Sequence, residues 1–408
     1  MTRARRWPAL PHRTALLAPG LLLFFVAAFL LPTGPAYALV FYLCVLPAFW
    51  LRVAASPLPW LRDGGAWLGF ALIVWSGLTL IWGHDDQHRT LRFLGDTVFT
   101  LLFFGAMLCA LRGPALRRQL GTVMIWAGTG NALLSVLLGQ ILPQNGPRLH
   151  GWGATNHPIL GATVMATAYL CAVSRALSEA GRRAAYLAAA AAMVMFILFT
   201  ESRGPLLAAL AATLFLCAAS PIPARALGLM AAGACGWWLL PARVQHHGAA
   251  ILVARGDSHR FGIWHRTLEM IAQRPLFGHG LAANLTFPGP GAREPGGLAN
   301  VSFPHDLYLS VLFYSGVVGG VLFLAVVATI TWRLFQARGA RDAIWLWTAG
   351  MWINVLVSGL TDLGQITKGP GPLWFIFWLP VTLTLATYPK EQKFFASFFQ
   401  KRRKLLLS

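Results

Sequence analysis

Long apolar runs, separated by short polar loops, make up most of this chain. A helix needs about 20 mostly apolar residues to cross a membrane, and twelve segments approach that length. The first follows a basic N-terminus without a clear small-residue cleavage site, so it is interpreted as a retained helix. The pattern predicts an all-α polytopic membrane protein with about twelve transmembrane helices. The predicted spans are residues 14–31, 35–53, 66–83, 91–111, 119–142, 157–176, 183–200, 204–220, 225–241, 305–333, 342–360 and 371–388.

One long polar segment, residues 242–304, interrupts this pattern. Apolar residues recur in it at helical spacing from Phe261 onward, and Pro275 ends the repeat. We therefore predict one large loop that contains an amphipathic helix lying at the membrane surface. The predicted apolar face of that helix consists of Phe261, Trp264, Leu268 and Ile271.

The long loop divides the chain into four regions. We expect a nine-helix transmembrane region, the loop, three further spans and a basic tail that lies against anionic lipid. These regions are residues 1–241, 242–304, 305–388 and 389–408.

The composition supports a membrane protein and indicates its orientation. Hydrophobic residues form 57% of the chain and charged residues 11%, against about 25% charged in soluble domains. The net charge of +20 would suggest nucleic-acid binding in a soluble protein, but here the basic residues lie mainly in short loops. With both termini in the cytoplasm, 22 of the 33 Lys and Arg residues fall on the cytoplasmic side and five in the opposite short loops. Such an excess places the long loop outside.

Several function classes are disfavoured by the same survey. No phosphate-binding loop of the G-x-x-x-x-G-K-[ST] type occurs, which argues against a mechanism driven by cytoplasmic nucleotide. The five cysteines lie in apolar runs and not at metal-ligand spacing. The predicted spans are nearly free of internal charge, whereas a lipid or polysaccharide transporter would carry paired charges in mid-span. A non-enzymatic transporter remains the alternative from a different class.

Three arginines on the outer side are candidates for binding an anion: Arg148, Arg203 and Arg260. Arg203 lies in the turn 200–205, where Gly and Pro open the next helix. A guanidinium at a helix N-terminus suits a phosphate, and two or three guanidiniums would hold a diphosphate. The alternatives are a salt bridge from Arg203 to Glu201, and contacts with lipid headgroups for Arg148 and Arg260.

The histidine best placed for proton chemistry is His305. Pro304 fixes the backbone for a helix start, which places His305 and Asp306 in the first turn of the tenth span. A general base works best with a pKa near neutral, which suits histidine. The alternative is a histidine bonded to a nearby carbonyl. Asp362, near the outer end of the eleventh span, could orient a base, pair with an arginine, or pair with Lys368.

The one acidic cluster is His84-Asp85-Asp86-Gln87-His88. Carboxylates and imidazoles could bind a divalent metal there. A solvated loop explains the same residues, and we expect no metal and no other cofactor.

The order and spacing of these motifs resemble the O-antigen ligase/polymerase superfamily and, within it, the O-antigen ligases. The motifs cover roughly residues 140–320. One residue departs from the pattern, because many members have asparagine where this chain has Asp306. The matching elements are Arg148 to Gly151, Asn156 to Pro158, the turn 200–205, Arg260 with Trp264, Arg274 to Gly280, and His305 to Leu309.

The resemblance implies a GT-C-like glycosyltransferase of the bacterial inner membrane, with its site facing the periplasm. Its donor would be O-antigen on undecaprenyl diphosphate and its acceptor a sugar hydroxyl of lipid A-core, with inversion and without metal. Membrane lipids would be its other partners, and nucleic acid would not. Alternatives with the same chemistry are an O-antigen repeat-unit polymerase on the same carrier and a protein-glycosylating oligosaccharyltransferase.

The resemblance also implies roles for individual residues. Arg148 and Arg203 would bind the donor diphosphate, and Arg260 joins them on the argument from charge. His305 would be the general base. The supporting residues would be Asp306, Tyr308 and Asp362.

Overall fold

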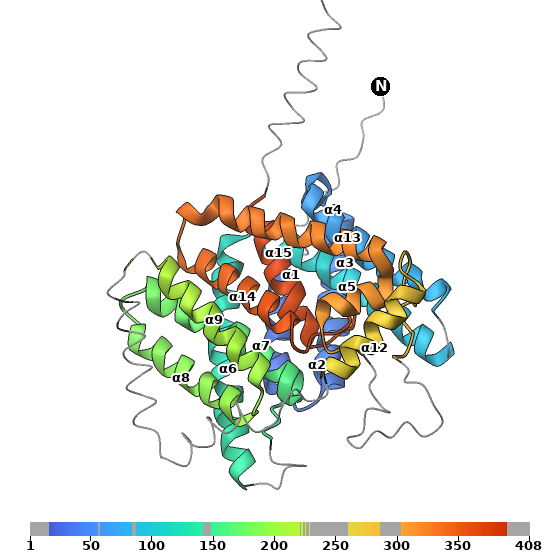
Figure 1. Ribbon diagram of the computed structural model, residues 1–408. Coiled ribbons are helices and arrows are strands. Elements are labelled where there is room, and N and C mark those ends of the chain that lie inside the picture. The colour runs from blue at the N-terminus through green and yellow to red at the C-terminus, as the bar shows by residue number, and fades with distance from the viewer. Residues whose placement is uncertain are drawn as a thin grey trace, which may run out of the picture.

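The computed structural model of the chain describes residues 16–55, 58–83, 87–141, 148–220, 222, 225, 228, 260–285 and 303–389. Every regular element in these residues is a helix, and Figure 1 shows them as one bundle. The α-helices are α1 (Leu17–Leu30), α2 (Gly34–Val40), α3 (Leu46–Ala55), α4 (Gly64–Leu78), α5 (Gln87–Ala110), α6 (Pro114–Ile141), α7 (Pro158–Ser178), α8 (Arg183–Phe199), α9 (Arg203–Ala219), α12 (Arg260–Gln273), α13 (Leu307–Gln336), α14 (Ala343–Gly359) and α15 (Leu379–Thr387). Two π-helical turns, Phe41–Val45 and Trp374–Trp378, precede α3 and α15.

Eleven of the twelve predicted spans coincide with helices. Six helices of the described residues are long and apolar enough to cross a membrane, and five further apolar helices are shorter. The chain is therefore a polytopic membrane protein. Span 225–241 lies almost wholly outside the described residues, so the count of twelve and the four-region division stay predictions. The six long candidates are Gly34–Ala55, Gly64–Ile81, Gln87–Ala110, Pro114–Gly139, Pro158–Ser178 and Leu307–Gly339.

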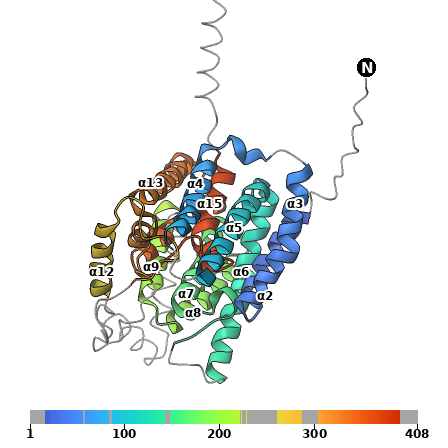
Figure 2. The same ribbon diagram turned by 90° about the vertical axis from the view of Figure 1, so that its right-hand side faces the viewer.

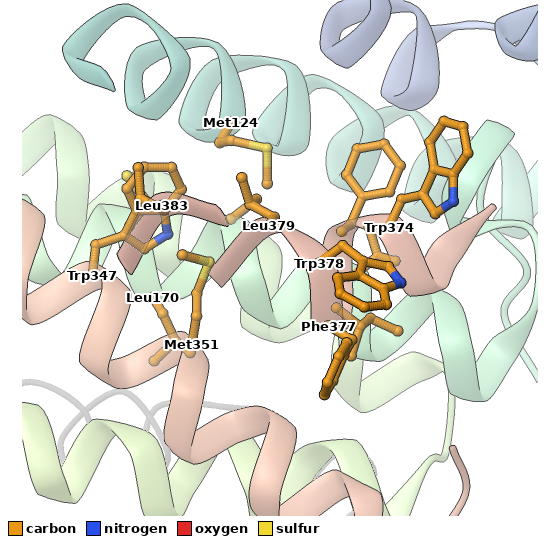
Figure 3. Close-up of a cluster of buried hydrophobic side chains, with 14 of the residues drawn as sticks. Met124, Leu170, Trp347, Met351, Trp374, Phe377, Trp378, Leu379 and Leu383 are labelled. Atoms are coloured by element: carbon orange, nitrogen blue, oxygen red, sulfur yellow. The ribbon is translucent and has the colours of Figure 1, made fainter. Parts of the chain in front are cut away.

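The core of the bundle is rich in large aromatic side chains. Figure 3 shows Trp347 of α14 and Trp374 and Trp378 next to α15 within one buried cluster, and α15 lies near the middle of both ribbon views (Figures 1 and 2). Each indole N–H donates a hydrogen bond inside the bundle: Trp347 to the Thr167 carbonyl (3.0 Å), Trp374 to the Thr100 hydroxyl (3.0 Å) and Trp378 to the Ile366 carbonyl (2.7 Å). These three indole rings are thus buried without leaving their N–H groups unsatisfied.

One end of the bundle is held by a buried ion pair. Arg333, near the end of α13, donates to both carboxylate oxygens of Asp63, at 2.5 and 2.8 Å. The same carboxylate caps α4 by accepting from the Gly65 N–H at 2.8 Å. Arg333 also donates to the Tyr388 carbonyl. The pair joins three segments that the charge distribution assigns to one side of the membrane.

The helix α13 is interrupted at Gly316, whose φ of 62° and ψ of −167° are not helical. Backbone groups freed inside a membrane need partners, because each unsatisfied group costs several kcal/mol. The segment 275–280 supplies them, and Trp75 donates its indole N–H to the Ser315 carbonyl at 3.0 Å. Four backbone hydrogen bonds join the two segments: His279 N–H to Phe313 (2.8 Å), Gly280 N–H to Tyr314 (2.9 Å), Val317 N–H to Pro275 (2.8 Å) and Val318 N–H to Leu276 (3.2 Å).

The amphipathic helix predicted in the long loop is α12, which packs beside α13 (Figures 1 and 2). Two residues of its predicted apolar face, Phe261 and Leu268, are 68% and 53% exposed and so do not pack against the protein. The face buried against the protein consists of Ile263, Thr267 and Met270. A helix at a membrane surface has two apolar neighbours, protein and lipid, and spacing alone does not separate them.

Candidate functional site

The candidate base lies at the other end of α13 from the Asp63–Arg333 pair. His305 precedes the helix in the left-handed region, with φ of 54°. The helix begins at Leu307, so the prediction that His305 and Asp306 occupy its first turn is wrong. Asp306 is instead the N-cap. Its backbone angles are extended, so the helix does not continue back to His305.

The imidazole of His305 is oriented by Asp362, which lies just after α14. The ring nitrogen Nδ1 donates a hydrogen bond to the carboxylate, and the Phe303 ring packs on the imidazole with centroids 4.1 Å apart. Asp362 is 4% exposed and the His305 side chain 30%. Because an ionised carboxylate only accepts, Nδ1 carries the proton and Nε2 is the basic nitrogen of the neutral ring. This arrangement suits a general base.

The neighbouring carboxylate, Asp306, contacts the helix start and not the imidazole. It accepts from the Leu309 N–H at 2.8 Å. Burial raises the pKa of Asp306, and the backbone N–H groups of Leu309 and Tyr308 oppose that rise. Asparagine and aspartate are equally good N-caps. The departure from the family pattern at this position thus preserves the capping function.

Tyr308 ties the same helix start to its neighbour. Its hydroxyl donates to the Leu356 carbonyl of α14 at 2.9 Å. Asp362 follows the C-terminal end of α14, so this bond helps to fix the distance between His305 and its carboxylate partner.

Arg260, the first residue of α12, reaches the same carboxylate. Its Nη2 lies 3.9 Å from the second oxygen of Asp362. Asp362 therefore both orients a histidine and pairs with an arginine, two of the three arrangements that the sequence allowed. This ion pair links the start of α12 to the carboxylate that orients the candidate base.

Arg148 and Arg203 meet at the turn that begins α9. Arg148 donates to the Thr200 carbonyl at 2.9 Å and to the Ser202 hydroxyl at 2.7 Å, and Arg203 is the first residue of the helix. The start of α9 packs against the turn that carries Asp362, since a Cβ on Gly204 would clash with Thr361. Arg260 thus contacts Asp362 directly, and Arg148 contacts the turn before α9, whose start packs against the turn that carries Asp362.

The structure adds His157, which sequence reasoning did not select. His157 caps α7, because its Nδ1 accepts from the N–H groups of Ile159 (3.2 Å) and Leu160 (3.3 Å). Its position before a proline at a helix start was the available signal. Burial lowers the pKa of His157, and four charged or titratable side chains act on it electrostatically. Asp362 opposes the lowering, and the groups that add to it are Arg148, His150 and His305.

This cap predicts a pH dependence of stability. The unfolded histidine takes up a proton near pH 6.5, whereas the folded one resists it, so the folded state loses stability as pH falls below about 6.5. We expect wild-type protein to lose about 1 kcal/mol, the value of one cap, between about pH 7.5 and 5.5. His157→Asn, which keeps an acceptor without titrating, should lose less in thermal unfolding. His265→Asn, at an exposed position on α12, should behave as wild type; equal losses in all three proteins would contradict the cap.

A cavity of about 470 Å³ lies against the His305–Asp362 pair. Phe303 and Asp362, which both contact the imidazole, form part of its wall. The other lining residues are His88, Arg89, Arg92, Phe93, Leu160, Tyr314, Gly364, Gln365, Lys368 and Leu373.

The described part of the chain contains no group of three or more His, Cys, Asp or Glu side chains that could hold a metal ion. The predicted acidic cluster lies mainly outside that part, since residues 84–86 are not described. His88 is described, and it lines the cavity.

Two comparisons with known proteins bear on this site. The sequence model of the family described as O-antigen ligase matches residues 188–324, which include Arg203, Arg260 and His305. A protein of Pseudomonas aeruginosa named O-antigen ligase is 27% identical over 377 residues, covering 88% of this chain and 87% of that protein. The chain is thus similar to the O-antigen ligase family within residues 188–324, and to a protein named O-antigen ligase along most of its length. Both comparisons point to an enzyme of lipopolysaccharide biosynthesis.

The family match ends before the carboxylate partner of the histidine. Asp362 lies beyond residue 324, and Arg148 lies before residue 188. The longer alignment, over 377 residues, is wide enough to extend beyond the matched region. The candidate site therefore combines residues of the matched region with Arg148 from the segment before it and Asp362 from the segment after it.

Proposed function

We propose that the chain is an inner-membrane glycosyltransferase that moves O-antigen from undecaprenyl diphosphate to a sugar hydroxyl of lipid A-core. The observation that supports this most is the His305–Asp362 pair with Arg148, Arg203 and Arg260 around it. A base and a cluster of guanidiniums are what sugar transfer from a diphosphate needs. Similarity to O-antigen ligases supports the choice of substrates.

The reaction follows from this arrangement. Nε2 of His305 takes the proton from the acceptor hydroxyl while its oxygen attacks the anomeric carbon of the glycan. The bond from that carbon to the diphosphate breaks, and the diphosphate leaves with the electron pair. The configuration inverts because the hydroxyl oxygen attacks the face opposite the leaving group. Asp362 stabilises the imidazolium that forms. The arginines stabilise the charge on the leaving group without a metal ion.

The arginines contribute in different ways. Arg203 lies at a helix N-terminus, where the helix dipole also favours an anion. Arg148 braces the turn that carries Arg203 through Thr200 and Ser202. Arg260 pairs with Asp362, which also binds His305, and so connects the arginines that would bind the diphosphate with the base.

The proposed active site faces the periplasm, and both termini lie in the cytoplasm. The two ends of α13 support this orientation. Arg333 lies with Asp63 and Tyr388, in segments that carry the excess of basic residues. His305 lies with Asp362 at the other end, where basic residues are fewer in the short loops.

The direct test is transfer in vitro by the purified protein, with lipid-linked O-antigen as donor and lipid A-core as acceptor. We expect a glycosylated lipid A-core product that forms equally well in EDTA. A product in which O-antigen units are instead joined on the carrier lipid would identify a repeat-unit polymerase. A deletion strain separates the same two activities: core lacking all O-antigen indicates the ligase, and core bearing one repeat unit indicates the polymerase.

Arg203→Lys is expected to lower kcat/KM for transfer by about 100-fold, because an ammonium does not reproduce the two-pronged guanidinium contact to a phosphate. Arg274→Lys, an exposed arginine just beyond α12, is the matched control and should retain wild-type kinetics. The measurement is steady-state transfer at varied donor concentration. Wild-type kinetics in the Arg203 variant would reduce this residue to a headgroup contact.

A further inference from the structure

The cavity beside Asp362 carries positive charge of its own. Arg89 and Arg92 lie on the first turns of α5, and Lys368 lies in the segment after α14. Arg148, Arg203 and Arg260 do not line it. The cavity is therefore a basic site distinct from the predicted diphosphate site, although both adjoin the His305–Asp362 pair.

The cations of this cavity act on one another. Loss of hydration lowers the pKa of Lys368, and repulsion from Arg92 and Arg89 lowers it further, while Asp96 opposes the change. Three positive groups share the cavity wall, and the carboxylate in that wall, Asp362, is already engaged by His305 and Arg260. An incoming anion would relieve this repulsion.

The wall of the cavity is rigidly built. Arg89 donates to the Asn284 side chain and to the Ala283 carbonyl, and its guanidinium lies over the Phe93 ring at 5.5 Å. Gln365 donates to the Leu281 carbonyl at 2.8 Å. These contacts join α5, the segment 281–285 and the segment after α14, so Arg89 is held in place before a ligand arrives. Preorganisation of this kind favours binding, because less conformational entropy is lost.

We propose that this cavity binds a phosphate or carboxylate group carried by the sugars of the acceptor glycolipid. The inference rests on the proposed function. His305 must reach the acceptor hydroxyl, and the cavity shares with its imidazole both Asp362 and Phe303. The volume of about 470 Å³ lies within the usual range of ligand pockets, about 300–1,000 Å³. Anchoring an anionic group here would bring the acceptor sugar to the base, while the donor diphosphate occupies the arginines on its other side.

The test replaces the two exposed cations together, as Arg92→Gln with Lys368→Gln, and leaves Arg89 in place because it holds Asn284. The full-length purified protein is assayed at varied acceptor and donor concentrations. The KM for lipid A-core should rise at least about tenfold, since each hydrogen bond to a charged group contributes strongly. The KM for the donor and kcat should stay within about twofold. Arg274→Gln, an exposed arginine outside the cavity, should leave all three constants unchanged.

A second set of measurements distinguishes charge from general damage. The exchange Arg92→Lys with Lys368→Arg keeps both charges and should restore most of the acceptor affinity. Lipid A-core from which phosphate has been removed, or whose carboxylates have been reduced, should bind wild-type protein about tenfold more weakly. The Gln variant should not discriminate between native and neutralised acceptor, because the group that recognises the charge has been removed.

Two outcomes would overturn the inference. If the KM for the donor rises and that for the acceptor does not, the cavity holds the donor diphosphate. If neither changes, the cavity binds no anion of either substrate. Absence of transfer by the wild-type protein would instead contradict the proposed function. Acceptor binding to wild-type and Gln variants in lipid nanodiscs, measured without donor, then tests the cavity alone: equal affinities would overturn it, and a tenfold difference would support it.

Discussion

Replacing His305 by alanine is expected to lower the rate of glycan transfer by about 10²- to 10⁴-fold, the usual contribution of a general base. The imidazole Nε2 has no substitute at this position, because the nearest carboxylate, Asp362, is held between the imidazole and Arg260. Donor binding should be retained, since the proposed diphosphate contacts come from the arginines. The measurement is single-turnover transfer by purified protein, together with donor binding.

The control for this variant is His265→Ala. His265 lies on α12, its side chain is 79% exposed, and it pairs with Glu269 away from the candidate base. It should transfer glycan at the wild-type rate. Transfer by the His305 variant within a few-fold of wild type would show that His305 is not the base. Loss of donor binding in this variant would show that His305 supports the structure of the donor site instead.

Gly316→Ala is expected to destabilise the protein by at least about 3 kcal/mol. The backbone conformation at the break in α13 is open almost solely to glycine, and forcing another residue into it costs about 1–3 kcal/mol. In addition, a Cβ there would clash with the Leu276 carbonyl. The four backbone bonds between segment 275–280 and α13 would then be strained or lost. Thermal unfolding in detergent and the yield of monodisperse protein report the effect.

A glycine in the interior of another span provides the comparison. A Cβ at Gly95 of α5 would make only an ordinary contact, 3.9 Å from the Phe99 ring. Gly95→Ala should be neutral or slightly stabilising, by up to about 1 kcal/mol, because alanine favours helix. Similar midpoints for the two variants would show that the break in α13 does not depend on glycine.

The helices were readily predicted because a membrane span is a local property of about 20 consecutive residues. The start of α13 was misplaced by two residues, since proline at a helix start and aspartate as a cap compete for the same position. The sequence did not show which residues of α12 face the protein, because Phe261 and Leu268 are as apolar as the buried Ile263 and Met270.

Residues of the candidate site could be predicted where each is unusual in its own local sequence. An arginine beside a membrane span and a histidine at a helix start are unusual, so Arg203, Arg260 and His305 were identified. The pairing of Asp362 with His305 joins residues 57 positions apart, and nothing local selects it over a pair with Lys368. Arg89, Arg92 and Lys368 were counted only as outer charges, because the cavity exists only when α5 and the segment after α14 come together.

The break in α13 also has a consequence for biogenesis. Segment 275–280 is synthesised before α13, so its backbone groups precede the later helix into the membrane. Leu276 and Phe277 are exposed and apolar, which allows the segment to rest at the edge of the hydrocarbon until its partner arrives. Insertion of α13 is then complete only when the earlier segment docks at Gly316. The helix that carries the cap next to His305 is fixed at the same moment, so this protein acquires its candidate base only after the translocon has released the tenth predicted span.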